Sequence, residues 1–158
     1  MNRTEFENGI IAMQDVLYRV SATILHRPCD REDAIQECIL KAIMKREKLK
    51  NDRALRAWVI RILINECYAI LRRQKRVLLM DTVPEALPAP DADPEVFRLL
   101  FSLPEKWRLP MVLYYVEGCS TQEIAGILRI PSGTVRSRLT RGREKMKEMI
   151  KQEEAAAR

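Results

Sequence analysis

Residues 77–97 divide this chain into two parts more firmly than any other feature of its sequence. The segment carries five acidic residues, no lysine or arginine, and four prolines, at Pro84, Pro88, Pro90 and Pro94. Proline lacks a backbone N–H and restricts the residue before it, so a run this rich in proline does not continue a regular helix. We therefore predict an acidic, proline-rich linker over residues 77–95, with one domain in residues 1–76 and a second in residues 96–152.

Both flanking parts are basic. Residues 1–76 contain 16 lysines and arginines against 10 acidic residues, and residues 98–158 contain 12 against seven. The whole chain of 158 residues has a formal net charge of +6. Two basic blocks on either side of an acidic one indicate two modules that each bind a polyanion, such as a nucleic acid.

The N-terminal part is predicted to be entirely helical. Apolar residues recur at steps of three and four over residues 4–26, over residues 35–43 and over residues 54–75. The second of these helices is expected to be capped by Asp30 or Asp33. No stretch alternates like a β-strand, and aromatic residues make up only 6% of the chain. The fold class expected for both parts is all-α.

The C-terminal part begins with a short predicted helix that starts at Val96. We expect Pro104 in the first turn of the next helix and Pro110 either near its start or at a kink. Tyr115 and Val116 are predicted to face the core, and Gly118 is predicted to end the helix.

Residues 120–143 are typical of two short helices around a tight turn. Ser120 and Glu123 form an S-x-x-E capping box, in which each side chain accepts a hydrogen bond from a backbone N–H. The run Ile130-Pro131-Ser132-Gly133 interrupts this helix, and Ser132 is expected to cap the helix that follows.

The second of these two helices is predicted to enter a DNA major groove. Val135, Leu139 and Met146 fall on its inward face, whereas short polar residues and arginines fall on the other. Short side chains let the backbone approach DNA, and guanidinium groups reach phosphates or guanine edges. Gly142 is expected to weaken this helix by about 1 kcal/mol relative to alanine. A basic helix that is merely solvated is the alternative. The predicted DNA contacts are Ser132, Gly133, Thr134, Arg136, Ser137, Thr140 and Arg141.

The helix predicted over residues 54–75 also has two different sides. The apolar side consists of Ile60, Leu63, Ile64, Cys67 and Leu71. The other side consists of Trp58, Arg61, Asn65, Tyr68, Arg72, Lys75 and Arg76. Aromatic rings, an amide and cations on one face suit unpaired nucleic acid, where stacking contributes about 1–3 kcal/mol per base. The alternative is that Trp58 and Tyr68 belong to the core and that the cations only keep the helix soluble.

Neither catalysis nor a metal site is indicated. Cys29, Cys38, Cys67 and Cys119 are far apart in the sequence, and the chain has one histidine, His26, which we assign to a helix end. Three of the cysteines lie among apolar residues, which favours buried free thiols in a reducing cytoplasm. The N-terminus has no apolar segment typical of a secretion signal, and no apolar run is long enough to insert into a membrane.

With these motifs, the chain resembles a bacterial RNA polymerase sigma factor of the extracytoplasmic-function (ECF) group of the sigma-70 family. DREDAIQECILKAI resembles the region 2 helix that binds the polymerase clamp. LRAWVIRILINECYAILRRQKR is similar to the promoter-melting helix, and GTVRSRLTRGRE is similar to the recognition helix of region 4. The resemblance implies a transcription initiation factor without enzymatic activity or cofactor, working in the bacterial cytoplasm.

The resemblance also implies a role for each surface. Region 4 binds the −35 element through the groove helix, and region 2 captures the displaced non-template strand of the −10 element. The implied −10 contacts are Lys50, Asn51, Trp58, Arg61, Asn65, Arg72 and Arg73. Asp33, Gln36 and Glu37 are the implied polymerase contacts, although a solvated helix face has the same pattern. The implied partners are core RNA polymerase, through its clamp helices and flap, promoter DNA, and an anti-sigma factor that can tether the chain to a membrane.

Three other classes of protein fit this sequence less well than a sigma factor does. A stand-alone helix-turn-helix regulator is the first alternative, but it predicts a sensing domain with alternating strands and helices, which residues 1–76 lack. A nucleic-acid enzyme needs a carboxylate cluster or an activated nucleophile, and the sequence has neither pattern. A scaffold for acidic proteins would not distinguish promoter DNA from random DNA.

Overall fold

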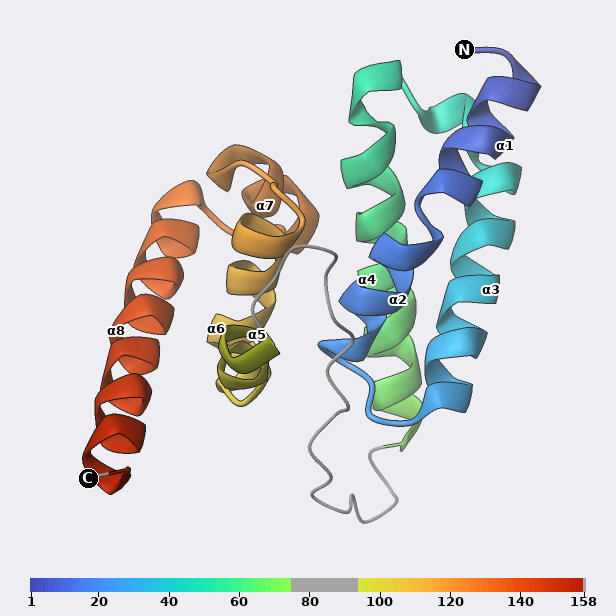
Figure 1. The fold of residues 1–158 in the computed structure, drawn as a ribbon. Coiled ribbons are helices and arrows are strands. Elements are labelled where there is room, and N and C mark those ends of the chain that lie inside the picture. Colours follow the sequence, from blue (N-terminus) through green and yellow to red (C-terminus); the bar gives the residue numbers. More distant parts are fainter. Residues whose placement is uncertain (75–93, 158) are drawn as a thin grey trace. The chain divides into compact units, whose positions relative to one another are not determined.

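The computed structural model describes residues 1–74 and 94–157, which form helices and connecting turns with no strand among them (Figure 1). The chain divides into two compact units, Met1–Glu85 and Ala86–Arg158. This confirms the predicted all-α fold. Most of the predicted acidic linker, residues 77–93, lies outside the described residues, as do Lys75 and Arg76 of the predicted cationic face.

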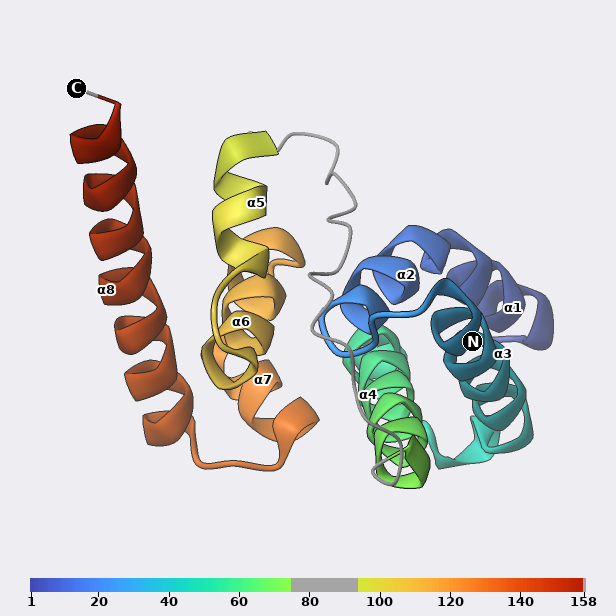
Figure 2. The same ribbon diagram turned by 90° about the horizontal axis from the view of Figure 1, so that it is seen from below.

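Unit 1 is a bundle in which α2, α3 and α4 all contact one another (Figures 1 and 2). Its core side chains include Phe6, Leu17, Val20, Val59 and Leu63, each at most 1% exposed. The elements are α1 (Arg3–Ala12), α2 (Gln14–Ala22), α3 (Pro28–Met44), the short 3₁₀ turns η1 (Arg46–Lys48) and η2 (Asp52–Ala54), and α4 (Leu55–Gln74).

The apolar stripe predicted over residues 4–26 is buried, but it belongs to two helices rather than one. Met13 adopts φ −92° and ψ 3°, which interrupts the helical hydrogen bonding between α1 and α2. Its N–H instead donates to the carbonyl oxygen of Ile10 at 3.0 Å. Phe6 before the break and Leu17 and Val20 after it remain buried. The pattern therefore identified the core side correctly and missed the bend.

The start of α3 differs from the prediction. The helix begins at Pro28, with Arg27 at the N-cap and no capping side chain, so Asp30 and Asp33 do not cap it. Proline suits the first helical position because its fixed φ is helical and its missing N–H would have no partner there. Asp30 instead accepts a hydrogen bond from Gln74 Nε2 at the end of α4, at 3.0 Å.

Unit 2 packs the long helix α8 against α6, α7 and α5. Its core includes Phe101, Leu113, Ile124, Val135 and Leu139. The elements are α5 (Pro94–Phe101), α6 (Glu105–Met111), the π-helical segment η3 (Val112–Val116), α7 (Thr121–Leu128) and α8 (Ser132–Ala156). Helix α5 thus begins two residues before the predicted Val96.

The π-helical segment overturns one core prediction. Val112 and Leu113 are buried, but Tyr115 is 52% exposed and Val116 is only partly buried. A π-turn holds more residues than an α-turn, so the side chains that follow change direction relative to an α-helical register. Pro110 lies inside α6 directly before this segment, and Pro104 is the N-cap rather than a first-turn residue. Gly118, at φ +70°, ends the segment as predicted.

The capping box predicted at the start of α7 is confirmed. The N–H of Glu123 donates to Ser120 Oγ at 3.1 Å, and the N–H of Ser120 donates to Glu123 Oε1 at 3.0 Å. The cap predicted at Ser132 is wrong, because α8 begins at Ser132 itself, with Pro131 at the N-cap and no side-chain hydrogen bond there. Instead, the carbonyl oxygen of Pro131 accepts hydrogen bonds from the backbone N–H groups of Thr134 and Val135.

Gly142 has a packing role that the sequence did not reveal. It is buried in α8, and a Cβ built there would lie 2.7 Å from Met111 Cγ at the end of α6. The expected gain of about 1 kcal/mol in helix propensity on replacement by alanine is therefore opposed by an overpacking cost of about 1–3 kcal/mol.

We predict that Gly142→Ala lowers the melting temperature of unit 2, measured by calorimetry on the full chain. Gly126→Ala is the matched control, because Gly126 is exposed in α7 and nothing lies within 4 Å of a Cβ there. That substitution is expected to stabilise the chain by up to about 1 kcal/mol. A stabilising Gly142→Ala would show that Met111 moves aside without cost.

Candidate nucleic-acid interface

The outward face of α8 carries most of the residues predicted to contact duplex DNA. Arg136, Ser137, Thr140 and Arg141 are exposed, and their spacing of three and four residues puts them on one side of the helix. Val135 and Leu139 are at most 2% exposed on the opposite side. Gly133 is exposed at the N-terminal end of the face, whereas Ser132 and Thr134 are partly buried.

The two hydroxyl groups on this face bond to their own helix. Ser137 Oγ donates to the carbonyl oxygen of Thr134, and Thr140 Oγ1 donates to that of Arg136, both at 3.0 Å. A hydroxyl whose proton is used in this way still offers its lone pairs to an outside donor. With their protons used in this way, the hydroxyl oxygens can accept hydrogen bonds from amino groups of bases. The arginines supply the donors for phosphates or guanine edges.

Arg143 is fixed to the rest of unit 2. Its guanidinium donates to Tyr115 Oη of η3 at 3.0 Å and to Thr140 Oγ1 at 3.3 Å. Tyr115 was expected in the core, and its exposed hydroxyl instead anchors this arginine at one edge of the α8 face. Sequence spacing gave no signal for this pair, since 28 residues separate its members.

The second candidate face lies on α4 in unit 1. Asn65 and Arg72 are exposed there, and Trp58, Arg61 and Tyr68 are partly buried. Trp58 makes an edge-on contact with Phe6, with 6.2 Å between the ring centroids. Because Phe6 is a core residue, this contact ties Trp58 to the core, although Trp58 itself is only partly buried. The two interpretations of Trp58, core residue and stacking surface, are therefore compatible.

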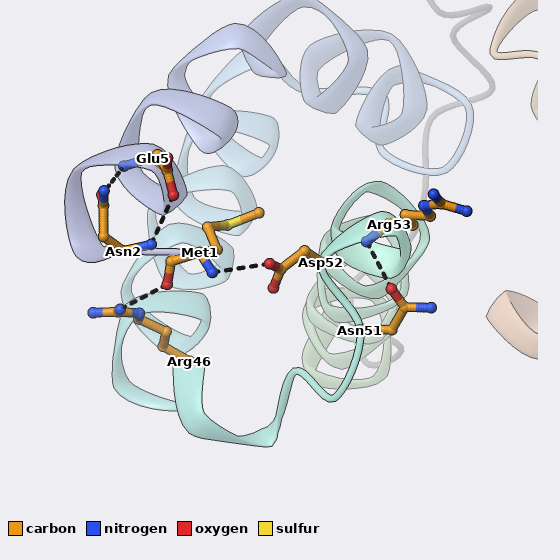
Figure 3. A network of polar contacts seen from close by, with 7 residues as sticks. All are labelled: Met1, Asn2, Glu5, Arg46, Asn51, Asp52 and Arg53. Carbon is orange, nitrogen blue, oxygen red and sulfur yellow. Dashed lines mark hydrogen bonds and ion pairs between the residues drawn. The ribbon is translucent and has the colours of Figure 1, made fainter.

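The loop that precedes α4 is held in place by the N-terminal residues (Figure 3). Asn51 Oδ1 accepts from the N–H of Arg53 at 3.0 Å and so caps the turn η2. Asp52 Oδ2 accepts from the α-amino group of Met1 at 2.9 Å, and this hydrogen bond raises the pKa of that amino group. Arg46 donates to the carbonyl oxygen of Met1 at 3.3 Å.

These contacts bear on the predicted role of the loop in binding DNA. Among the described residues, the side-chain amide N–H groups of Asn51 have no hydrogen-bond acceptor, although its oxygen is engaged. Lys50 is exposed beside it. The roles of Met1, Arg46 and Asp52 were not predicted, because they depend on contacts between segments about 50 residues apart.

Asp33, Gln36 and Glu37 line a groove between α3 and α4, with a volume of about 540 Å³. Leu40, 53% exposed, continues their row by one helical turn. Glu66 of α4, 8% exposed, also lines the groove and forms an ion pair with Lys41 of α3. The hydrogen bond to Glu66 raises the pKa of Lys41.

Arg73 belongs to this groove rather than to the face that carries Asn65. Its side chain lines the groove, and its Nε donates to the carbonyl oxygen of Ala69 at 3.4 Å. Arg72, one position earlier, lies two helical turns after Asn65, so both side chains are on the same side of α4. The structure thus separates two arginines that were predicted to act together.

The cysteines behave largely as predicted. Cys38, Cys67 and Cys119 are buried free thiols, and Cys29 is exposed. Burial raises the pKa of the Cys38 thiol to about 12. Within residues 1–74 and 94–157, no three His, Cys, Asp or Glu side chains are grouped so as to hold a metal ion. Each helix of the described residues is too short or too polar to be a membrane-span candidate.

Comparison with known proteins identifies both units. The family model for Sigma-70 region 2 matches residues 10–77, and the model for Sigma-70, region 4 matches residues 95–146. The ECF RNA polymerase sigma-E factor of Escherichia coli K12 is 33% identical over 136 residues, which cover 73% of this chain and 71% of that protein.

Two further relatives carry similar names. The ECF RNA polymerase sigma factor SigW of Bacillus subtilis is 27% identical, with 92% of this chain and 89% of that protein covered. SigE of Mycolicibacterium smegmatis is 31% identical, and the chain spans 58% of its length.

Solved structures show the same fold. The sigma factor RpoE of Bartonella quintana, in complex with the anti-sigma factor NepR, has a TM-score of 0.79 at 23% identity, with 93% of this chain and 97% of that chain covered. CnrH, in complex with the cytosolic domain of CnrY, has a TM-score of 0.67 at 21% identity, with 95% and 90% covered.

Proposed function

Because the chain belongs to the ECF group of RNA polymerase sigma factors and has its role in transcription initiation, we propose that its two units bind one promoter at two sites. The observation that carries the proposal is the presence of matches to both region 2 and region 4 in a single chain. A stand-alone helix-turn-helix regulator, the alternative expected from the sequence, gives no reason for a region 2 unit. In this assignment, region 2 spans residues 1–76 and region 4 spans residues 96–152.

Region 4 binds the −35 element as a duplex. Helix α8 lies in the major groove, with Arg136, Ser137, Thr140 and Arg141 toward base edges and phosphates. The exposure of all four side chains supports this role. Ser132, Gly133 and Thr134, at the N-terminal end of α8, are assigned to the same surface, because the first backbone N–H groups of a helix, here those of Ser132 and Gly133, bind phosphate.

Region 2 holds the displaced non-template strand of the −10 element. Trp58 supplies a stacking surface, Asn65 supplies an amide for a base edge, and Arg61 and Arg72 neutralise the backbone. Lys50 and Asn51 border this face from the loop before α4. Extruding a base costs a few kcal/mol of lost stacking, which these contacts offset.

Core RNA polymerase is the proposed protein partner. Asp33, Gln36 and Glu37 meet the clamp helices through the groove between α3 and α4, and region 4 meets the flap. Leu40 extends the clamp-binding row with an exposed apolar side chain, the kind of residue that protein interfaces bury. Arg73 lines this groove, so we assign it to the polymerase-binding surface rather than to the −10 contacts that the resemblance implies.

We further propose that an anti-sigma factor controls the chain, because the structurally similar sigma factor RpoE is held in a complex with the anti-sigma factor NepR. The chain acts in the bacterial cytoplasm, where the polymerase is, and an anti-sigma factor anchored in a membrane can tether it there. It carries no catalytic residue of its own, since synthesis of RNA is the chemistry of the polymerase.

Run-off transcription tests the proposal. Core polymerase and genomic promoter fragments are incubated with and without the chain, and the expected result is new transcripts that depend on it. Fragments retained by the complete holoenzyme supply the promoter. Absence of chain-dependent transcripts from every fragment would contradict the proposed function.

Arg141→Ala is expected to weaken binding to the −35 duplex. If the guanidinium contacts a phosphate, the slope of log K against log salt falls by about one. Fluorescence anisotropy over a salt series measures both quantities. Lys151→Ala is the control, because it removes one positive charge from the same helix about 15 Å farther along. Transcription and binding equal to those of the unchanged chain would remove Arg141 from the interface.

A further inference from the structure

A hollow beside the recognition helix brings three cations together from two helices. It has a volume of about 300 Å³, and no acidic residue of the described parts of the chain lines it. Its lining residues are Lys106 and Trp107 of α6 and Thr134, Ser137, Arg138 and Arg141 of α8. Lys106 and Trp107 belong to none of the contact sets assigned above.

The positive charge of the three cations is the second feature of the hollow. Among the described residues, no carboxylate forms an ion pair with Lys106, Arg138 or Arg141. Other cations of unit 2 are paired, since Arg98 contacts Glu95 and Glu153, and Lys145 contacts Glu148 at 3.3 Å. Three like charges around one hollow repel one another, so the arrangement favours an anion from outside.

Lys106 is held in position by its neighbour. Its ammonium group lies 5.3 Å from the centroid of the Trp107 ring, within the range of a cation–π interaction. Trp107 is itself partly buried, which limits its movement. A lysine ordered in this way loses less conformational freedom when it binds a ligand than a lysine free in solvent.

The hollow is continuous with the proposed DNA surface. Ser137 and Arg141 line the hollow and also lie on the exposed face of α8. Arg138 lies between the exposed Ser137 and the buried Leu139 in the sequence. It is therefore at the edge of the exposed face of α8. A DNA strand at the edge of a groove that holds α8 therefore passes next to the three cations.

We propose that Lys106, ordered by Trp107, binds a backbone phosphate of the DNA duplex, with Arg138 and Arg141 as the opposite wall of the same site. The inference rests on the function proposed for α8 and extends the region 4 interface to the first turn of α6. Ammonium and guanidinium groups both donate charge-assisted hydrogen bonds to phosphate oxygens. Phosphate contacts fix the register of a protein on DNA without selecting a sequence, so this site positions α8.

Fluorescence anisotropy of the full chain on a labelled duplex of mixed sequence tests the site, over salt concentrations from about 50 to 200 mM. Lys106→Gln is expected to weaken binding and to reduce the slope of log K against log salt by about 0.9, the value for one lost phosphate contact. Lys151→Gln removes the same charge at an exposed position of α8 outside the hollow. Its slope is expected to equal that of the unchanged chain.

Two results of this experiment would overturn the inference. A slope for Lys106→Gln equal to that of the unchanged chain would mean that this lysine contacts no phosphate. An equal reduction for Lys151→Gln would mean that only net charge matters. Run-off transcription distinguishes failure of the phosphate site from failure of the proposed function. If Lys106→Gln leaves the salt slope unaltered and the chain still directs transcription, only the phosphate site is refuted.

Tryptophan fluorescence identifies the source of the phosphate. In a Trp58→Phe background, Trp107 is the remaining tryptophan, and its emission is titrated with the duplex and with inorganic phosphate. A change with the duplex, lost in Lys106→Gln, supports the proposal. A response to inorganic phosphate alone would assign the hollow to a free anion and overturn it.

Discussion

Replacing Asn65 by alanine is expected to abolish most promoter opening while binding to duplex DNA is retained. Asn65 is exposed in the middle of α4, and no hydrogen bond to it is found among the described residues. Its amide is therefore available to a base edge and contributes little to the fold. A well-placed amide contact is worth about 1–3 kcal/mol, so the population of open complexes should fall by about one to two orders of magnitude.

Permanganate reactivity of unpaired thymines measures the amount of open complex. Fluorescence anisotropy on a −35 duplex measures duplex binding by unit 2. Asn8→Ala is the matched control, because Asn8 is an exposed asparagine on α1, away from the proposed strand-binding face. Equal losses of opening and of duplex binding, or a lowered melting temperature, would give Asn65 a structural role instead.

Arg31→Met is expected to cost unit 1 about 3 kcal/mol of folding free energy. The guanidinium is only 3% exposed and bonds to two carbonyl oxygens of the turn between α2 and α3, that of Leu25 at 2.8 Å and that of His26 at 3.0 Å. Methionine replaces the aliphatic stem of arginine but has no donor, so both carbonyls lose the guanidinium as a partner. Hydrogen bonds to charged groups are worth about 1.5–3 kcal/mol each, and an orphaned buried acceptor adds a cost.

Unfolding in urea measures the loss of folding free energy. In a Trp107→Phe background, the fluorescence of Trp58 monitors the unfolding of unit 1. Arg31→Lys keeps the charge but not the fork of donors, so it should be intermediate. Arg3→Met is the surface control, because the ion pair of Arg3 with Glu7 is exposed to solvent and contributes little to stability. An Arg31→Met chain as stable as the unchanged one would show that water replaces the guanidinium.

Conversely, several local features were decided by residues close together in the sequence. The capping box of Ser120 and Glu123 and the helix end at Gly118 each need only a few neighbouring residues, and both are confirmed. The burial of Cys38, Cys67 and Cys119 follows from apolar neighbours at helical spacing. The face of α8 that carries Arg136 and Arg141 follows from the helical repeat, which fixes direction as soon as the inward residues are known.

The sequence therefore determined the all-α class, the two units, the side of α8 that faces inward and the family of the chain. These properties depend on periodicity, capping and short motifs. Only the tertiary structure decided the bend at Met13, the outward turn of Tyr115, the need for glycine at position 142 and the hollow beside Lys106. Each of these depends on which side chain of a distant segment occupies the neighbouring space. Packing of that kind acts between residues far apart in the chain, so no local pattern records it.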